Sequence, residues 1–186
     1  MGSDLIFKLY SDNRTVFTLQ EIGMLADISD FNKLKQQIYY FVKRGKLMRL
    51  RRGIYTKENF NYEELACKIY VPSYISLEYV LQKSGVIFQY SSQITIVSYL
   101  SRTVNTENLS IRCRKIKNDI LYNIQGIKRD ETGINIADPE RAFLDCLYLN
   151  NQMHLDSPGS LDADIINKLL PVYNSKQLAN KILKYF

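Results

Sequence analysis

The chain has 186 residues, of which 46% are hydrophobic and 24% are charged. This composition excludes a wholly disordered chain, a collagen-like repeat and a disulfide-stapled miniprotein, and the length suffices for two small domains. No apolar run approaches the roughly 18 residues of a membrane helix, and the first residues lack the pattern of a signal peptide. We therefore expect a cytoplasmic protein, whose three scattered cysteines are buried, reduced side chains.

The positive charge is concentrated near the beginning of the chain. The net charge is +6, and residues 1–60 hold 11 Lys and Arg against 6 Asp and Glu, whereas the remaining residues hold 14 against 13. Between residues 30 and 57, nine cations face a single acid, Asp30. Such a cluster in a small unit is typical of a polyanion binder, with a solvated charged face as the alternative.

The first sixty residues predict a winged helix-turn-helix. A short helix at 4–10 and a β-prone stretch at 15–17 precede a second helix, which Thr18 and Glu21 open as a capping box. A third helix over 31–44 ends at a glycine, and a basic hairpin with strands at 47–50 and 54–57 follows. Its apolar stripe consists of Phe31, Leu34, Ile38, Phe41 and Val42.

The free face of the third helix and the hairpin predict the DNA-binding residues. Amide and amino groups suit base edges in the major groove, whereas guanidinium groups suit phosphates or the minor groove. The predicted base readers are Asn32, Lys33, Gln36, Gln37 and Tyr40. The predicted contacts to phosphates or the minor groove are Lys35, Lys43, Arg49, Arg51 and Arg52. Tyr39, Tyr40 and Tyr55 could stack on a sugar or bind a phosphate, but for Tyr39, near the edge of the apolar stripe, partial burial is expected instead.

Residues 61–186 predict a second domain of mixed sheet and helix, so that the whole chain is of the α+β class. Helices are expected over 61–70, over 76–83 with Ser76 as its cap, after Asp138, and over 161–170 and 175–185. Strands are expected at 94–100 and 109–114, with a hairpin over 127–136.

Two polar clusters in this second part could suggest catalysis. Gly159-Ser160 followed by Asp162 and Asp164 is similar to a nucleotidyltransferase signature, but no room is left for the helix and strand that should separate its parts. We interpret this segment as a helix start capped by Ser160. The second cluster consists of Asp138, Glu140, Arg141 and Asp145. These residues are predicted either to cap the helix that follows Asp138 and form a local ion pair with Arg141, or to contact a partner. With a lone histidine, His154, and no phosphate-binding loop, we predict no metal and no cofactor.

Three segments, in the same order along the chain, resemble the AbiEi-type antitoxins of abortive-infection (type IV) toxin–antitoxin systems. They are Lys43–Tyr55, Tyr74–Tyr79 continuing to Ser84–Ile87, and Ile136–Leu149. The first is shared by many winged helices, and the other two are distinctive. One departure is Asp138, where the family usually has Ser; both are good N-caps.

The resemblance implies a DNA-binding antitoxin, which is not an enzyme. Members of this family typically repress their own operon through a winged helix, which corresponds to residues 1–60 here. Their C-terminal domain, residues 61–186 here, is associated with counteracting a nucleotidyltransferase-like toxin, in many members without a stable complex. One alternative is a stand-alone winged-helix regulator whose second domain senses a ligand or dimerises. The other is a nuclease or transferase that uses Asp138, Glu140 and Asp145; gene neighbourhood and divalent-metal binding separate the three.

Overall fold

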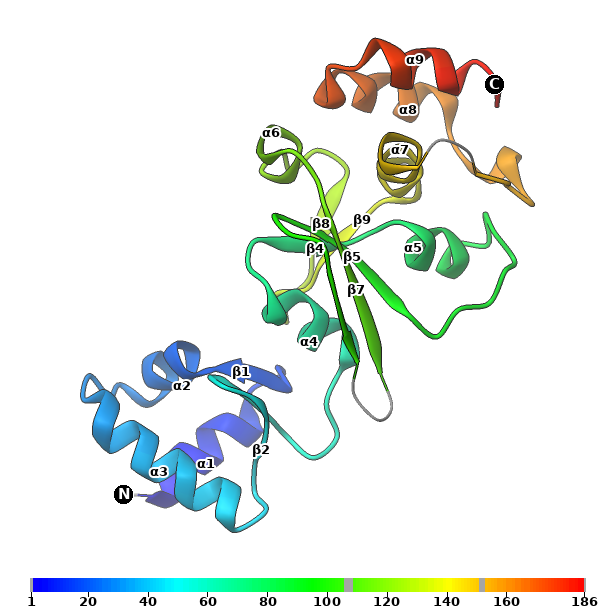
Figure 1. Cartoon of the computed structure of the whole chain (residues 1–186). Coiled ribbons are helices and arrows are strands. Elements are labelled where there is room, and N and C mark those ends of the chain that lie inside the picture. Colours follow the sequence, from blue (N-terminus) through cyan, green and yellow to red (C-terminus); the bar gives the residue numbers. More distant parts are fainter. Residues whose placement is uncertain (1, 106–108, 151–152, 186) are drawn as a thin grey trace. The chain divides into compact units, whose positions relative to one another are not determined.

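The computed structural model describes residues 2–105, 109–150 and 153–185 (Figure 1). The chain divides into two compact units, Met1–Ile69 and Tyr70–Phe186, here called the N-terminal and C-terminal units. The division falls nine residues after the boundary expected from the sequence. The helix that begins at Tyr62 therefore belongs with the elements that precede it.

The N-terminal unit has the element order that the sequence predicts, with a further helix after the hairpin. Its elements are α1 (Gly2–Ser11), β1 (Val16–Thr18), α2 (Leu19–Ala26), α3 (Phe31–Lys43), β2 (Met48–Arg51), β3 (Ile54–Thr56) and α4 (Tyr62–Ile69). The strands form an antiparallel sheet in the order β1-β3-β2. The helices and the sheet enclose one core, formed by Leu5, Leu9, Phe17, Ile22, Leu34, Ile38, Phe41, Leu47 and Tyr55.

Local signals determine where these elements begin and turn. The capping box is present: the Thr18 hydroxyl accepts from the backbone of Glu21, and the Glu21 carboxylate accepts from the backbone of Thr18. This satisfies two of the unpaired N–H groups at the start of α2. The turn between β2 and β3 places Gly53 at φ +81°, a conformation that residues with a Cβ rarely adopt. The hairpin formed by β2, this turn and β3 is called the wing below.

The C-terminal unit is built on a mixed sheet with the strand order β6-β7-β5-β4-β9-β8. The strands are β4 (Ser73–Ile75), β5 (Ile94–Ser98), β6 (Arg102–Asn105), β7 (Ser110–Lys115), β8 (Ile127–Arg129) and β9 (Asn135–Ala137). The helices are α5 (Glu78–Lys83), α6 (Asn118–Leu121), α7 (Pro139–Leu149), α8 (Ala163–Leu169) and α9 (Lys176–Ile182), with 3₁₀ turns at Pro158–Ser160 and Leu170–Tyr173. Helices α5 and α7 cover one face of the sheet, and α8 and α9 lie beyond α7 (Figure 1). The α+β class is confirmed.

Two predicted helix caps in this unit are wrong. Ser76 does not cap α5, because Leu77 occupies the N-cap position and the Ser76 hydroxyl donates to Asp145 instead, at 2.7 Å. Ser160 does not cap α8, because the Asp162 carboxylate accepts from the first backbone N–H groups of that helix. The interpretation of this segment as a helix start is otherwise confirmed.

Candidate nucleic-acid interface

Helix α3 exposes one polar face because most of its apolar stripe points into the core; Phe31, which was expected in that stripe, is instead 48% exposed. Three of its residues are buried in the core: Leu34, Ile38 and Phe41. The carboxylate of Asp30 accepts hydrogen bonds from the backbone of Asn32 and Lys33, which fixes the start of the helix. At 100° per residue, the side opposite the buried stripe carries three of the predicted contacts, all exposed: Asn32, Gln36 and Lys43.

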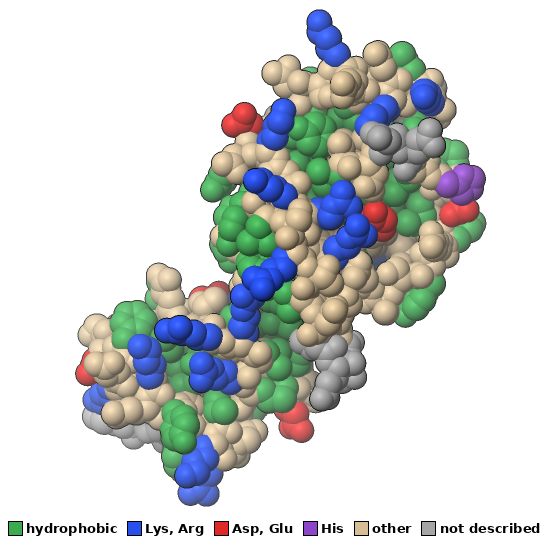
Figure 2. Space-filling model, in the orientation of Figure 1, with side chains coloured by type: hydrophobic (Ala, Val, Ile, Leu, Met, Phe, Trp, Pro, Cys, Tyr) green, Lys and Arg blue, Asp and Glu red, His purple; other side chains and the backbone are tan. Residues whose placement is uncertain are grey.

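A groove of about 640 Å³, called the wing groove below, separates α3 from the wing. Its lining residues come from α3 (Lys35, Tyr39 and Val42), from the wing (Arg49, Arg52, Gly53 and Tyr55) and from the start of α2 (Leu19). Figure 2 shows Lys and Arg side chains spread over the visible surface of this unit. The structure thus brings Lys35, Arg49 and Arg52, which are separate in sequence, around one concave surface.

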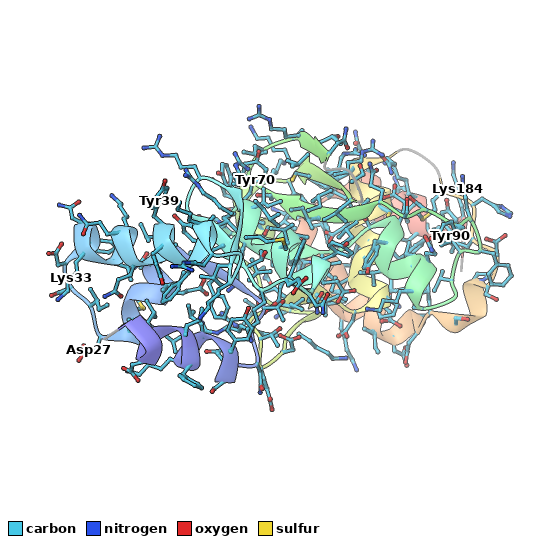
Figure 3. The ribbon with its side chains drawn as sticks, turned by 90° about the horizontal axis from the view of Figure 1, so that it is seen from below. Asp27, Lys33, Tyr39, Tyr70, Tyr90 and Lys184 are labelled. Carbon is cyan, nitrogen blue, oxygen red and sulfur yellow. The ribbon has the colours of Figure 1, made fainter. Side chains whose placement is uncertain are left out.

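The opposite flank of α3 is acidic. A second groove, of about 420 Å³, is lined there by Asp4, Leu5, Ala26, Asp27, Ile28, Ser29, Asp30, Lys33 and Gln37. Figure 3 shows Lys33 and Asp27 near the same end of α3. The three carboxylates of this flank would repel a phosphate backbone. Lys33 and Gln37 therefore share their side of α3 with three carboxylates.

The remaining predicted contacts lie at exposed positions. Tyr40 is 52% exposed, and the guanidinium of Arg44 lies over its ring, 5.3 Å from the ring centroid. Arg51 is exposed at the end of β2, where it pairs with Ile54 across a register shift in the wing.

The expectation that Tyr39 is partly buried is wrong. Its side chain is 69% exposed and lines the wing groove, and it projects from the side of α3 away from α1 (Figure 3). The helical period explains the error, since Tyr39 lies about 100° from its buried neighbour Ile38 and follows the outward side of the stripe. Tyr39 therefore lies at the edge of the candidate interface and not at the edge of the core.

The cations of the N-terminal unit fall into two groups. The first group stabilises the fold. The Arg14 guanidinium donates two hydrogen bonds to the Asp12 carboxylate, at 2.6 and 2.9 Å, and the Lys57 ammonium donates to the Asp12 carbonyl at 2.6 Å. Burial lowers the pKa of Lys57, and the hydrogen bond from Arg14 holds the pKa of Asp12 below its ordinary value. The second group, in the wing groove, makes no ion pair with any of the described residues; it consists of Lys35, Arg49 and Arg52.

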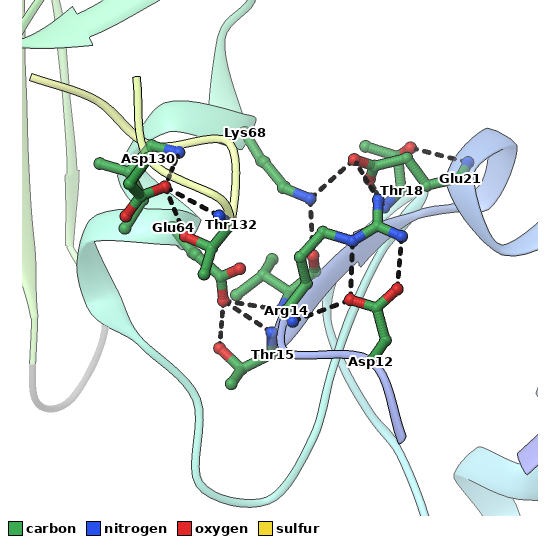
Figure 4. A network of polar contacts seen from close by, with 11 residues as sticks. Asp12, Arg14, Thr15, Thr18, Glu21, Glu64, Lys68, Asp130 and Thr132 are labelled. Atoms are coloured by element: carbon green, nitrogen blue, oxygen red, sulfur yellow. Dashed lines mark hydrogen bonds and ion pairs between the residues drawn. The ribbon is translucent and has the colours of Figure 1, made fainter. Parts of the chain in front are cut away.

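Two charged residues of helix α4 form hydrogen bonds with the rest of the N-terminal unit (Figure 4). The Glu64 side chain is buried, and its Oε2 accepts hydrogen bonds from the backbone of Thr15 at 2.7 Å and of Val16 at 3.1 Å, and from the Thr15 hydroxyl. The Lys68 ammonium donates to the Val16 carbonyl at 2.7 Å and to the Glu21 carboxylate at 2.8 Å.

These contacts extend the winged unit beyond the wing. Burial opposes ionisation of Glu21, but hydrogen bonds from Lys68 and Thr18 outweigh it and hold the pKa of Glu21 below its ordinary value. The same carboxylate completes the capping box at the start of α2. Helix α4 therefore supports both β1 and the helix that precedes α3.

In the C-terminal unit, two of the four residues predicted to contact a partner lie in the interior. Arg141 and Asp145 are both fully buried on α7, with 3.6 Å between Arg141 Nε and the Asp145 carboxylate. Arg141 also donates to the Ile120 and Gln125 carbonyls, at 2.8 and 3.0 Å. In this fold the pair cannot form a partner surface, because no part of either side chain reaches solvent.

Hydroxyl groups complete this buried network. Ser76 and Tyr173 each donate to the Asp145 carboxylate at 2.7 Å, and Arg141 donates to the Tyr74 hydroxyl at 3.2 Å. Burial raises the pKa of Asp145 above its ordinary value, against the opposing effect of Arg141. Two of the segments that carry the resemblance, around residues 74–79 and 136–149, therefore contact each other in the core.

The other two predicted partner residues are more accessible, but both also have structural contacts. Glu140 is 8% exposed, and its carboxylate accepts from the backbone of Asp162. Asp138 forms an ion pair with Lys128 at 2.5 Å. It occupies the N-cap position of α7 but makes no capping hydrogen bond with its side chain.

The described residues offer no site for a metal and no span for a membrane. Within residues 2–105, 109–150 and 153–185, no three His, Cys, Asp or Glu side chains gather as metal ligands would. None of the described helices is long and apolar enough to cross a membrane. The three cysteines are free and buried, as expected from the sequence.

Helices α1, α2 and α3, the small antiparallel sheet and the basic wing define this part of the N-terminal unit as a winged helix-turn-helix, a class of fold that places one helix in a DNA groove. Residues 4–56, from α1 to the end of β3, match a family model described as "Transcriptional regulator, AbiEi antitoxin". The match confirms the resemblance for this part of the chain, and the description is that of a regulator. A search of curated proteins found no match to this chain.

Proposed function

We propose that the protein is a DNA-binding antitoxin that represses its own toxin–antitoxin operon and counteracts a nucleotidyltransferase-like toxin in the bacterial cytoplasm. The observation that carries the DNA-binding part is the wing groove, where Lys35, Arg49 and Arg52 are left without carboxylate partners beside the exposed face of α3. The family description supports both the regulatory and the antitoxin roles.

For base recognition we propose fewer residues than the sequence predicts, chosen by their positions on α3. Asn32 and Gln36 lie on the exposed side of α3, where their amide groups suit adenine in the major groove. Lys33 and Gln37 are left out, because they share their flank with three carboxylates. The wing cations are assigned to phosphates or the minor groove, and Lys43 and Arg51 supplement them at exposed positions.

The first experiment is fluorescence anisotropy of the full chain with two duplexes over a series of salt concentrations. One duplex carries the region upstream of the gene, and the other has the same bases in scrambled order. A specific repressor should prefer the first by about a thousandfold or more and show a steep salt slope. Weak and equal binding to both would contradict the repressor function.

Variants test whether the wing supplies the contacts. Converting Arg49 and Arg52 to Ala should weaken binding to both duplexes and reduce the salt slope by about two, because about one counterion is released for each phosphate contact. Lys184→Ala, which removes an exposed cation in the C-terminal unit, is the matched control and should leave the slope unchanged. An unchanged slope in the double variant would refute the assignment.

The antitoxin role needs a separate measurement. Co-expression with a nucleotidyltransferase-like toxin encoded beside the gene should restore growth, and variants that no longer bind DNA should still restore it when expressed from an unrelated promoter. Failure to restore growth, combined with specific DNA binding, would favour the stand-alone regulator instead.

A further inference from the structure

The wing groove combines an apolar floor with a cationic rim. Leu19, Val42 and Tyr55 contribute apolar surface, while the rim carries Lys35 on one side and Arg49 and Arg52 on the other. One more side chain stands on the helix side of the rim, the exposed Tyr39. An apolar surface with positive groups around it matches a deoxyribose ring with its flanking phosphates, because the sugar is largely apolar and the phosphates are anionic.

Duplex geometry indicates which part of DNA such a groove holds. In B-DNA a sugar–phosphate strand separates the major groove from the adjacent minor groove. If α3 occupies the major groove and the wing reaches across to the minor groove, the strand between them must pass between α3 and the wing. The space at that position is the wing groove.

We propose that the wing groove seats the sugar–phosphate backbone of one DNA strand, and that the Tyr39 hydroxyl donates a hydrogen bond to one of its phosphates. This rests on the proposed function, which requires DNA binding but does not require Tyr39. Among the described residues, the Tyr39 hydroxyl makes no hydrogen bond, so its donor is free to bind a phosphate oxygen. Tyrosine hydroxyls are common donors to DNA phosphates.

A neutral donor has a signature that distinguishes it from the cations around it. Losing a lysine or arginine contact reduces both the affinity and the salt slope, because fewer counterions are released. Losing the tyrosine hydroxyl reduces the affinity alone. Because a phosphate is present at every position of every duplex, the loss should also be equal for the upstream and scrambled sequences.

The test compares Tyr39→Phe with Lys35→Ala in the full chain, by anisotropy on both duplexes over the salt series. Tyr39→Phe is expected to weaken binding to each duplex by about tenfold with an unchanged slope, whereas Lys35→Ala weakens both and reduces the slope by about one. Tyr90→Phe is the matched control, since Tyr90 is 80% exposed in the C-terminal unit. Circular dichroism checks that each variant is folded.

A second measurement locates the contact on the DNA. Methylphosphonates, which replace single phosphates by neutral groups, are introduced one at a time along the upstream duplex. At one position, the methylphosphonate should weaken binding of the wild-type protein but should not weaken binding of Tyr39→Phe any further.

The outcomes separate this inference from the proposed function. If wild type binds DNA and Tyr39→Phe binds each duplex as tightly as wild type does, the groove assignment is overturned while the proposed function stands. If only the upstream duplex loses affinity, Tyr39 contacts a base, and the backbone assignment is again overturned. If wild type binds neither duplex, DNA binding itself fails and the assignment falls with it.

Discussion

The buried carboxylate of Glu64 should be the residue outside the wing on which the N-terminal unit depends most. It lies on α4, and its Oε2 accepts the backbone N–H groups of Thr15 and Val16. Glu64→Leu leaves the buried N–H of Val16 and the partly buried N–H of Thr15 without an acceptor. A buried group costs about 1–3 kcal/mol and a partly buried one less, so the free energy of unfolding should fall by about 2–4 kcal/mol. Glu64→Gln keeps an acceptor but removes the charge, and about 1 kcal/mol should be lost.

Thermal unfolding of the full chain, followed together with hydrogen exchange, measures this effect. For a unit of this size, each kcal/mol lowers the midpoint by about 4–8 °C. Exchange should accelerate first at the amides of Thr15 and Val16, which lose their acceptor. Glu58→Gln is the matched control, because Glu58 is exposed in the same unit and should change the stability by less than about 0.5 kcal/mol. If Glu64→Leu unfolds no earlier than this control, α4 does not support the winged unit and the reasoning is refuted.

Three further predictions concern acid stability and the core of the C-terminal unit. Because the pKa of Glu21 is lowered in the folded state, its carboxylate stabilises the fold at pH values above its ordinary pKa of 4.5, and this contribution is lost as the pH falls through the lowered pKa. Glu21→Gln lacks the contribution, so its melting midpoint should decline less steeply than that of wild type between pH 6 and 3. Asp145→Asn leaves Arg141 buried without an ionised partner, so urea unfolding should show a loss of about 3–5 kcal/mol. Gly126→Ala forces a Cβ to within 3.0 Å of the Arg141 Cβ at a φ of +71°, and should lower the melting midpoint, whereas Gly159→Ala, with no neighbour within 4 Å, should not.

Elements that rest on local signals were predicted well from the sequence. The capping box of Thr18 and Glu21, the helix ending before Gly45 and the basic hairpin involve residues only a few positions apart. Their physical causes, a reciprocal pair of hydrogen bonds, an amphipathic period and a left-handed glycine, can be seen in a short window of sequence. The winged fold followed from the order of these signals.

Features that rest on distant partners were not predicted. Ser76 has the character of a helix cap, but its hydroxyl is bound by Asp145, 69 residues away. Glu64 resembles any solvent-facing acid on an amphipathic helix, and only the tertiary structure brings it to Thr15, 49 residues earlier. The charged pattern of Arg141 and Asp145 suggested a surface because isolated charges are rarely buried. Their i,i+4 spacing allows the two side chains to pair, but no local pattern shows that the pair is buried.

The internal use of acids explains why a modest net charge can still produce a cationic interface. Asp12, Glu21 and Glu64 are bound by backbone groups and structural cations within the N-terminal unit. The carboxylates of the α3 flank lie on the side away from the wing. The wing groove is therefore left with cations and no neighbouring acid among its lining residues, although residues 1–60 carry a net charge of only +5.

Moving one acid to this surface, as in Tyr39→Glu, should reduce DNA binding more than Tyr39→Ala, because the added carboxylate would repel the strand as well as lack the donor. Equal loss in the two variants would show that the groove is not near the phosphates.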